Sequence, residues 1–245
     1  LLSKFGKKVL VLEQHYIAGG STHSFNDKNI EHDTGLHYIG NSNKIKSIFN
    51  LLTYNHLKWC KLGWERNDNK DIYDEIIIGD RRYEFEAGED NIKKYLISKF
   101  PDESIDAFDK YFNLVKKVAR NESFFISKIL PFKFLSKILS WFNEDSKYYY
   151  NGSAYDIVKG FFKNEELISV IFGQFGNYGL TPKNASFFLH ATIVNHYLNG
   201  GLYPIGGSSE IANQICKTII HYGGEVLVGK KVIKILQHKN QVYGV

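Results

Sequence analysis

The sequence has 245 residues, a formal net charge of +5 and 15% aromatic residues, enough length for one large domain or two small ones. The lysines are dispersed and form no arginine-rich block, so a nucleic-acid partner is not expected. Cys60 and Cys216 lack metal-ligand spacing, so neither a metal site nor a disulfide framework is expected. The residues contain no apolar run of about eighteen, the length that predicts a membrane-spanning helix.

The sequence contains no methionine, although a complete translation product begins with one, so we expect a fragment of a longer chain. Residues 1–7 have the pattern of a last helical turn closed by Gly6. A phosphate-binding G-x-G-x-x-G turn and any signal peptide are therefore expected upstream of Leu1.

Residues 9–12 form a short apolar run, which predicts a parallel strand buried on both faces. Glu13 follows at the position where a doubly wound fold places the carboxylate that binds a ribose. Gly19 and Gly20 then precede small hydroxyl residues, and would let backbone N–H groups approach a pyrophosphate. An ordinary tight turn is the alternative. The stretch predicts the second strand of a dinucleotide-binding domain.

A polar loop follows a short hairpin expected between Phe25 and Ile30. It contains Asp33, Gly35 and His37. The five-residue spacing of His32 and His37 fits neither a helix face nor a strand face, so a zinc site is not expected.

Four motifs carry a resemblance to a known family. They are V-L-V-L-E-Q-H at 9–15, A-G-G at 18–20, D-T-G-L-H-Y-I-G at 33–40 and N-H-Y-L-N-G-G-L-Y-P-I-G-G-S-S-E-I at 195–211. Together they resemble the retinoid and carotenoid oxidoreductases, the flavoprotein family that includes phytoene desaturases and carotenoid isomerases. The resemblance covers most of the chain but less than half of a family member. It implies an α/β fold, in which an incomplete FAD-binding Rossmann-like domain (residues 1–41 and 201–245) holds an inserted α+β substrate domain (residues 42–200).

The resemblance also implies a function. The intact enzyme is expected to bind FAD and to saturate the C13–C14 double bond of all-trans-retinol, with NADPH or NADH as a possible electron donor, at the endoplasmic reticulum membrane. The fragment alone is not expected to turn over. A carotenoid isomerase or desaturase is the enzyme alternative, and a non-catalytic membrane-surface module is the alternative of another class.

The cofactor-binding positions implied by the resemblance lie in the motifs and in one later strand. They are Glu13, Gly19, Gly20, His23, Asp33, Gly35, Gly206, Gly207 and Val232. No residue can be assigned as a catalytic acid or base. His37 is the candidate proton donor, because histidine titrates near neutral pH, and a purely structural hydrogen bond is its alternative role. Family members often carry cysteines after the glycine doublet, where this chain has Ser21, so no thiol chemistry is expected there.

The middle of the chain predicts a hairpin over residues 72–85 and helices over 91–100 and 102–120 separated by Pro101. Ile105, Phe108, Phe112 and Val115 recur at helical spacing and are expected in the core. The segment from Phe124 to Phe142 combines a narrow basic stripe with a broad apolar surface, which suits either a helix at a bilayer interface or a core helix. The interfacial reading is favoured, because a retinoid partitions into membranes.

The sequence from residue 153 onward predicts further helices and strands, the last of which return the chain to the first domain. Ser153 begins a capping box. Residues 172–179 mix glycine with aromatic residues, either as the lining of a polyene tunnel or as a loop that packs its own rings. A helix over 211–222 with a serine cap, strands over 225–228 and 232–236, and a turn at Lys239 complete the chain. The strand containing Val232 is expected near the adenine.

Overall fold

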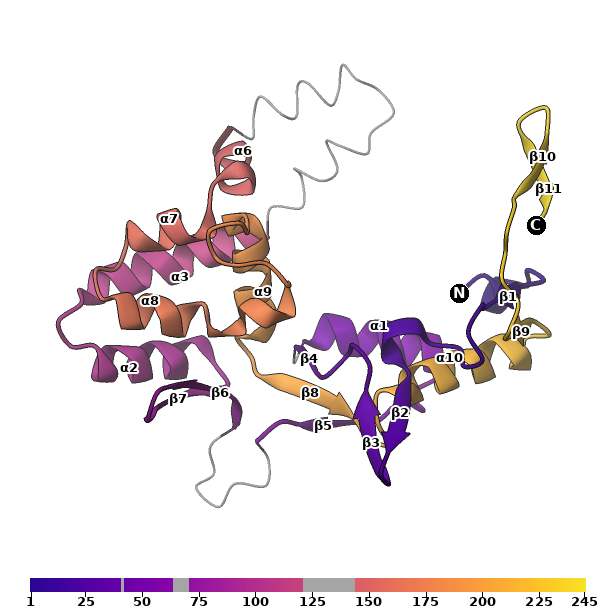
Figure 1. Ribbon diagram of the computed structural model, residues 1–245, viewed down its shortest axis with the longest axis horizontal. Coiled ribbons are helices and arrows are strands. Elements are labelled where there is room, and N and C mark those ends of the chain that lie inside the picture. The colour runs from indigo at the N-terminus through magenta and orange to yellow at the C-terminus, as the bar shows by residue number, and fades with distance from the viewer. Residues whose placement is uncertain (41, 64–70, 121–143) are drawn as a thin grey trace. The chain divides into compact units, whose positions relative to one another are not determined.

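The computed structural model describes residues 1–40, 42–63, 71–120 and 144–245. The chain forms two compact units (Figure 1). Unit 1 comprises Leu1–Lys61 and Leu202–Val245, and unit 2 comprises Leu62–Gly201. The amphipathic segment expected over residues 124–142 lies outside the described residues.

Unit 1 contains a parallel strand pair. Strand β1 (Leu10–Leu12) lies beside β9 (Glu225–Leu227), with Leu10 opposite Glu225 and Leu12 opposite Leu227. The prediction of a parallel strand is confirmed, but its burial on both faces is wrong, because Leu10 is 56% exposed. In the described residues β1 pairs only with β9, and this two-stranded sheet leaves Leu10 open to solvent.

A hairpin and a small sheet follow in unit 1. Strands β2 (Ser24–Asp27) and β3 (Ile30–Asp33) form the predicted hairpin. Its two turn residues, Lys28 and Asn29, both have positive φ, as a two-residue type I′ turn requires. A three-stranded sheet has β8 (Gly201–Pro204) between β4 (Ile39–Gly40) and β5 (Trp59–Lys61). Strands β5 and β8 are antiparallel, so the segment that returns from unit 2 is held in the sheet of unit 1.

Two amphipathic helices, α1 (Asn43–Thr53) and α10 (Ser209–His221), pack together in unit 1 (Figure 1). The sequence-based division placed α1 and β5 in the inserted domain. In the structure both lie in unit 1, because α1 packs on α10 and β5 pairs with β8.

The C-terminal part of unit 1 departs from the predicted strands. Strand β10 (Leu236–His238) pairs with β11 (Gln241–Gly244) around a turn at Lys239 and Asn240. The strand predicted over residues 232–236 is wrong, since residues 230–235 have no regular secondary structure. Ile233 is 89% exposed. Apolar β-branched residues favour a strand only where another strand pairs with them, and none does so among the described residues.

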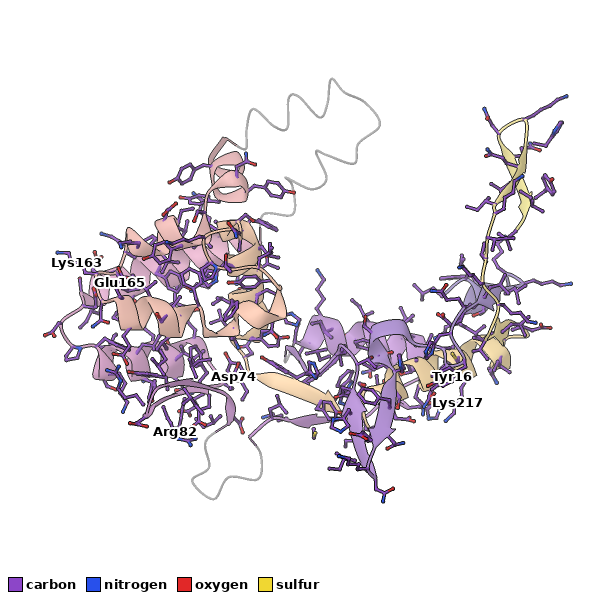
Figure 2. The ribbon with its side chains drawn as sticks, viewed as in Figure 1. Tyr16, Asp74, Arg82, Lys163, Glu165 and Lys217 are labelled. Atoms are coloured by element: carbon purple, nitrogen blue, oxygen red, sulfur yellow. The ribbon has the colours of Figure 1, made fainter. Side chains whose placement is uncertain are left out.

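Unit 2 joins one hairpin to a group of helices. The hairpin consists of β6 (Ile72–Ile78) and β7 (Arg81–Glu86), as predicted. The helices are α2 (Glu89–Lys99), α3 (Ile105–Ala119), α6 (Glu144–Asn151), α7 (Ala154–Lys159), α8 (Glu165–Ile171) and α9 (Phe187–Tyr197). Figure 2 labels Asp74 and Arg82 on the hairpin, and Asp74 accepts a hydrogen bond of 2.9 Å from Gln174.

The core of unit 2 forms where α3 packs on α9. Phe108, Phe112 and Val115 are buried as predicted, whereas Ile105 is 60% exposed. Ile105 is the first residue of α3, directly after the N-cap Ser104, so it lies at the solvent end of the helix and its predicted burial is wrong. Ser153 caps α7 as predicted, accepting from the Asp156 amide.

The glycine–aromatic stretch lies between α8 and α9. It forms a 3-10 helix over Gly173–Asn177. Phe172 is buried, with its ring centre 4.6 Å from that of His190. The cavity that reaches Gln174 has a volume of about 20 Å³, room for a single water molecule. In the described residues, Phe172 and Tyr178 of this stretch lie against His190 of α9, with ring centres 4.6 and 6.4 Å away. The lining of a polyene tunnel stays a prediction.

Candidate dinucleotide site

Glu13 lies at the carboxyl end of the parallel pair. Its backbone N–H donates to Leu227 of β9 at 2.9 Å, and its carbonyl accepts from Lys230 at 2.8 Å. The side-chain Oε1 accepts from the His15 N–H at 2.8 Å, which fixes the carboxylate next to the strand end. A carboxylate accepts several hydrogen bonds, so this contact leaves acceptor capacity for a ribose. The carboxyl edge of parallel strands is where open α/β sheets bind ligands.

The two glycines of the doublet have different environments. A Cβ on Gly19 (φ +134°) would lie 2.9 Å from Ala212 Cβ on α10 and 3.0 Å from Thr22 Oγ1. Gly19 is therefore needed for packing against α10. A Cβ on Gly20 (φ +56°) would meet nothing within 4 Å. Only Gly20 presents an open backbone surface of the kind that a pyrophosphate needs.

His23 connects the glycine loop to the strand end. Its Nδ1 lies 2.7 Å from the Gly20 carbonyl, and its ring centre is 4.9 Å from that of His15. The His23 backbone carbonyl accepts from both the N–H and the hydroxyl of Thr34, at 3.2 and 2.7 Å. His23 thus joins the glycine loop to the polar loop that begins at Asp33.

Asp33 is the centre of a polar network. Its Oδ2 accepts from the Tyr203 hydroxyl at 2.8 Å, and its Oδ1 accepts from the Ser208 hydroxyl at 2.5 Å. Ser208 is fully buried and also lies 3.1 Å from the Thr22 carbonyl. A hydroxyl has one proton to donate, and Asp33 is the closer acceptor. Segments 19–23, 33–36 and 203–208 meet here, and we call them the loop cluster.

The network changes the chemistry of Tyr203. Burial first, and then the hydrogen bond to Asp33 and its negative charge, raise the pKa of Tyr203 to about 12. A tyrosine hydroxyl is protonated at neutral pH at its ordinary pKa, and the raised pKa keeps Tyr203 a donor to Asp33 in more alkaline solution as well. Both carboxylate oxygens of Asp33 are used to hold the loop cluster together, so the structure gives this residue a structural role.

The remaining predicted glycines also make close contacts inside the chain. A Cβ on Gly35 would lie 3.0 Å from Ser21 Cβ, beside the Leu36 N–H bond to the Ser21 carbonyl at 2.9 Å. A Cβ on Gly206 would lie 2.9 Å from Glu210 Cγ, and one on Gly207 3.2 Å from Glu31 Oε1. Both turn glycines have φ near +95°, at 96° and 94°, which L side chains rarely adopt.

Two predicted residues lie outside this network of contacts. His37 is exposed in the loop before β4. Val232 is 44% exposed in the irregular segment between β9 and β10. The structure therefore brings together His23, Asp33 and the glycines at 19, 20, 35, 206 and 207, and connects Glu13 to them through His15.

Three residues in the network were missed by sequence reasoning: Ser208, Tyr203 and Thr34. A serine cap was predicted for this helix without naming the serine; Ser208 stands at the N-cap of α10, makes no side-chain cap bond and donates to Asp33 instead. Asp33 is partly buried, and a carboxylate withdrawn from water needs donors; that need was the one available signal. Its donors lie 170 and 175 residues away, beyond the reach of a local pattern.

The described residues show no group of three or more side chains that could hold a metal ion. Cys60 and Cys216 are free thiols, and Cys60 Sγ lies 3.4 Å from the Tyr203 carbonyl. None of the helices in the described ranges has the length and hydropathy needed to cross a bilayer.

Sequence comparisons match this geometry. Residues 1–54 fit the family model described as an NAD(P)-binding Rossmann-like domain. The chain is 36% identical over 249 residues to an all-trans-retinol 13,14-reductase of Danio rerio, covering 96% of this chain and 40% of the relative. The all-trans-retinol 13,14-reductase of Homo sapiens is 34% identical, and the match covers 96% of this chain and 39% of that protein. A Danio rerio protein named inactive all-trans-retinol 13,14-reductase is 29% identical, with 100% and 41% covered.

Solved structures show the same fold. A crystal structure of a Pyrococcus furiosus protein aligns with a TM-score of 0.62 at 15% identity, covering 99% of this chain and 50% of the other. An oxidoreductase from Methanosarcina mazei aligns with a TM-score of 0.54 at 15% identity, covering 100% and 53%. The chain spans about two fifths of the length of the curated relatives it matches. Over that portion it is a mixed α/β protein whose residues 1–54 fit a Rossmann-like family model, and it is similar to the all-trans-retinol 13,14-reductases.

Proposed function

We propose that this chain is one part of an FAD-dependent oxidoreductase. The whole enzyme would saturate the C13–C14 double bond of all-trans-retinol. The observation that carries the proposal is the 36% identity along 96% of the chain to a protein named for that reaction. The acidic residue at the carboxyl end of a parallel strand pair supports it, because that is where a dinucleotide fold binds a ribose.

FAD is the dinucleotide that we propose for the site. When bound, FAD supplies the hydride chemistry that the reaction needs. Glu13 would accept from the ribose hydroxyls, since its carboxylate is held at the strand end by the His15 N–H. Gly20 would admit the pyrophosphate, because no atom lies within 4 Å of a Cβ built there.

The loop cluster would position these groups. Asp33 ties the polar loop to Ser208 and Tyr203, while Gly19 allows the glycine loop to pack on Ala212 of α10. In this proposal Asp33, Gly35, Gly206 and Gly207 shape the floor beside the cofactor. His37 remains the proposed proton donor, since its side chain is exposed in the loop that follows Asp33.

The substrate assignment follows the named relatives. We propose an apolar polyene with a retinol head group, NADPH or NADH as electron donor, and a location at the surface of the endoplasmic reticulum membrane. A carotenoid isomerase or desaturase activity is the enzyme alternative. The relative named inactive supports a second candidate, a non-catalytic homologue, but it is less similar, at 29% identity against 36%.

The cofactor proposal is tested by titrating FAD into the 245-residue chain and following flavin fluorescence. Glu13→Gln removes the charge that accepts from the ribose, and we expect about a tenfold weaker affinity, as for a lost charged hydrogen bond. Glu225→Gln is the matched control, because Glu225 is exposed at the opposite end of the same strand pair. Equal affinities for the three proteins would contradict the role of Glu13.

The substrate proposal is tested in a chimera, the Danio rerio reductase with its matched segment replaced by this chain. Retinol and a carotene are fed together, and the products are separated by chromatography. We expect 13,14-dihydroretinol and unchanged carotene. Conversion of the carotene alone would contradict retinol as the substrate and support the carotenoid alternative.

A further inference from the structure

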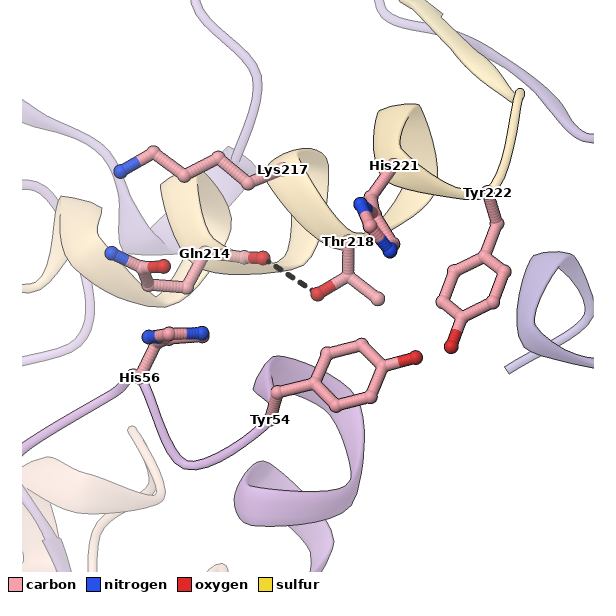
Figure 3. A pocket seen from close by; sticks show the side chains of 7 residues that line it. All are labelled: Tyr54, His56, Gln214, Lys217, Thr218, His221 and Tyr222. Carbon is pink, nitrogen blue, oxygen red and sulfur yellow. Dashed lines mark hydrogen bonds between the residues drawn. The ribbon is translucent and has the colours of Figure 1, made fainter.

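A second pocket lies in unit 1, beside the C-terminal half of α10 (Figure 3). Its volume is about 670 Å³, within the range of small-molecule sites. We call it the α10 pocket. The side chains that line it come from the loop that follows α1, from α10 and from the residue after α10: Tyr54, His56, Gln214, Lys217, Thr218, His221 and Tyr222.

Topology separates this pocket from Glu13. Helix α10 ends at His221, and the chain enters β9 at Glu225, which pairs with Leu10 at the first residue of β1. Glu13 follows the last paired residue of β1. Because β1 and β9 are parallel, the end of α10 lies at their amino edge and Glu13 lies at their carboxyl edge. The α10 pocket is therefore distinct from the dinucleotide site.

The aromatic lining offers flat apolar surfaces. The rings of Tyr54 and Tyr222 lie nearly parallel, at an interplanar angle of 18° with centres 6.0 Å apart. Both side chains are partly open to solvent, at 40% and 38% exposed. Lys4 Nζ lies 3.8 Å from the centre of the Tyr54 ring, which fixes this ring and adds a positive charge beside the pocket.

The polar lining favours an anion. Lys217 and His221 lie one turn apart on α10, and His56 lies across from them (Figure 3). Lys217 is exposed on α10 in Figure 2. None of the seven residues that line this pocket in the described chain is acidic. The one acidic residue of α10, Glu210, accepts from Asn213 and Gln214. The pocket thus combines positive charge with aromatic faces.

We propose that the α10 pocket binds a nucleoside monophosphate. The ring of the base would stack on the exposed faces of Tyr54 and Tyr222, as bases do on aromatic side chains. The phosphate would be bound by Lys217 and the neighbouring histidines, since an ammonium group binds phosphate as a point charge. The Thr218 hydroxyl donates to the Gln214 carbonyl at 3.0 Å, which leaves its oxygen as an acceptor toward the ligand.

The test is a calorimetric titration of the 245-residue chain with adenosine monophosphate, adenosine, ribose 5-phosphate and inorganic phosphate. We expect adenosine monophosphate to bind at least tenfold more tightly than the other three compounds. Lys217→Ala should weaken its binding about tenfold, as for loss of a charge-assisted contact. Lys8→Ala is the matched control, because it removes the same charge from an exposed site in unit 1 outside the pocket.

Two further measurements test whether the base contributes to binding and whether the ligand occupies the α10 pocket. Tyr222→Leu removes an aromatic ring on which the base would stack. It should weaken the binding of adenosine monophosphate and leave the binding of inorganic phosphate unchanged. The titration is repeated with FAD saturating the dinucleotide site, and adenosine monophosphate binding that FAD abolishes would place this ligand there and overturn the proposal. Equal binding of ribose 5-phosphate would also overturn it, because the base would then contribute nothing. Circular dichroism checks that each variant remains folded.

Discussion

The Asp33 carboxylate and the Ser208 hydroxyl lie 2.5 Å apart, although 175 residues separate them in the sequence. This hydrogen bond connects the polar loop after β3 to the turn that begins α10. Tyr203, at 2.8 Å, provides a second donor from β8. Unit 1 is thus closed by a small polar network between the two parts of the chain that form it.

Ser208→Ala tests that closure. The partly buried Asp33 carboxylate would lose one of its two hydroxyl donors, and a hydrogen bond to a charged group contributes roughly 1.5–3 kcal/mol. We expect the free energy of unfolding, measured in urea, to fall by about that amount. Ser209→Ala is the control, because Ser209 is the next residue and begins α10. An equal effect of the two substitutions would contradict the role of the Asp33 contact.

The two glycines of the doublet should respond differently to substitution. In Gly19→Ala the new Cβ would lie 2.9 Å from Ala212 Cβ, at φ +134°, so we expect a loss of about 1–3 kcal/mol in unfolding free energy. In Gly20→Ala the Cβ meets no atom within 4 Å, at φ +56°, and the expected loss is about 1 kcal/mol. Gly20→Ala should instead weaken FAD binding. The reverse order of stabilities would contradict the packing of Gly19 on α10.

His190 makes the stability of unit 2 depend on pH. It is 1% exposed, and burial lowers its pKa to about 3. An unfolded histidine has a pKa of about 6.5. Between these two values the unfolded chain binds a proton that the folded chain does not, so stability rises with pH. Below pH 6.5 the contribution is progressively lost, by up to about 1.4 kcal/mol per pH unit.

This dependence can be measured by urea unfolding between about pH 5.5 and 7, where free carboxylates, with pKa values of about 3.9 and 4.3, are largely ionised. His190→Gln should reduce the slope of unfolding free energy against pH by the amount that corresponds to about one bound proton. His196→Gln provides a comparison, because burial lowers the pKa of His196 as well, but His196 is less deeply buried than His190. An unchanged slope in His190→Gln would show that His190 is not held neutral in the fold.

Tyr111→Phe tests the partner of His190. The Tyr111 hydroxyl and His190 Nε2 lie 2.9 Å apart, and both side chains are buried among aromatic rings. Removing the hydroxyl leaves a buried ring nitrogen without this partner, which costs about 1–3 kcal/mol. Tyr148→Phe is the control, since Tyr148 is 63% exposed and its substitution should change the unfolding free energy by less than about 0.5 kcal/mol. Equal stability of the two variants would contradict the contribution of this hydrogen bond.

Local patterns predicted the elements that depend on neighbouring residues. The hairpin expected between Phe25 and Ile30, the Ser153 cap and the helices on either side of Pro101 are all confirmed. Each depends on backbone conformations or capping bonds within a few residues. The strand before Glu13 is also confirmed, and it pairs in parallel with β9.

Long-range contacts could not be predicted in this way. Ser208 resembled an ordinary helix cap, and only the fold brings Asp33 to it. Gly19 and Gly35 resembled ligand-binding glycines, whereas their nearest contacts are Ala212 and Ser21 of the chain itself. Val232 lies in an apolar run typical of a strand, but no strand pairs with it among the described residues. A glycine requirement can arise from a ligand or from packing, and the sequence pattern is the same for both.

The most direct test of the proposed function compares two chimeras of the active Danio rerio reductase. One carries this chain in place of the matched segment, and the other carries the corresponding segment of the relative named inactive. Both are purified with FAD, and formation of 13,14-dihydroretinol from all-trans-retinol is followed by chromatography. We predict product from the first chimera, and the second shows whether the matched segment carries the difference between the two relatives. Flavin-loaded, folded protein from the first chimera that leaves retinol unchanged would contradict the proposal.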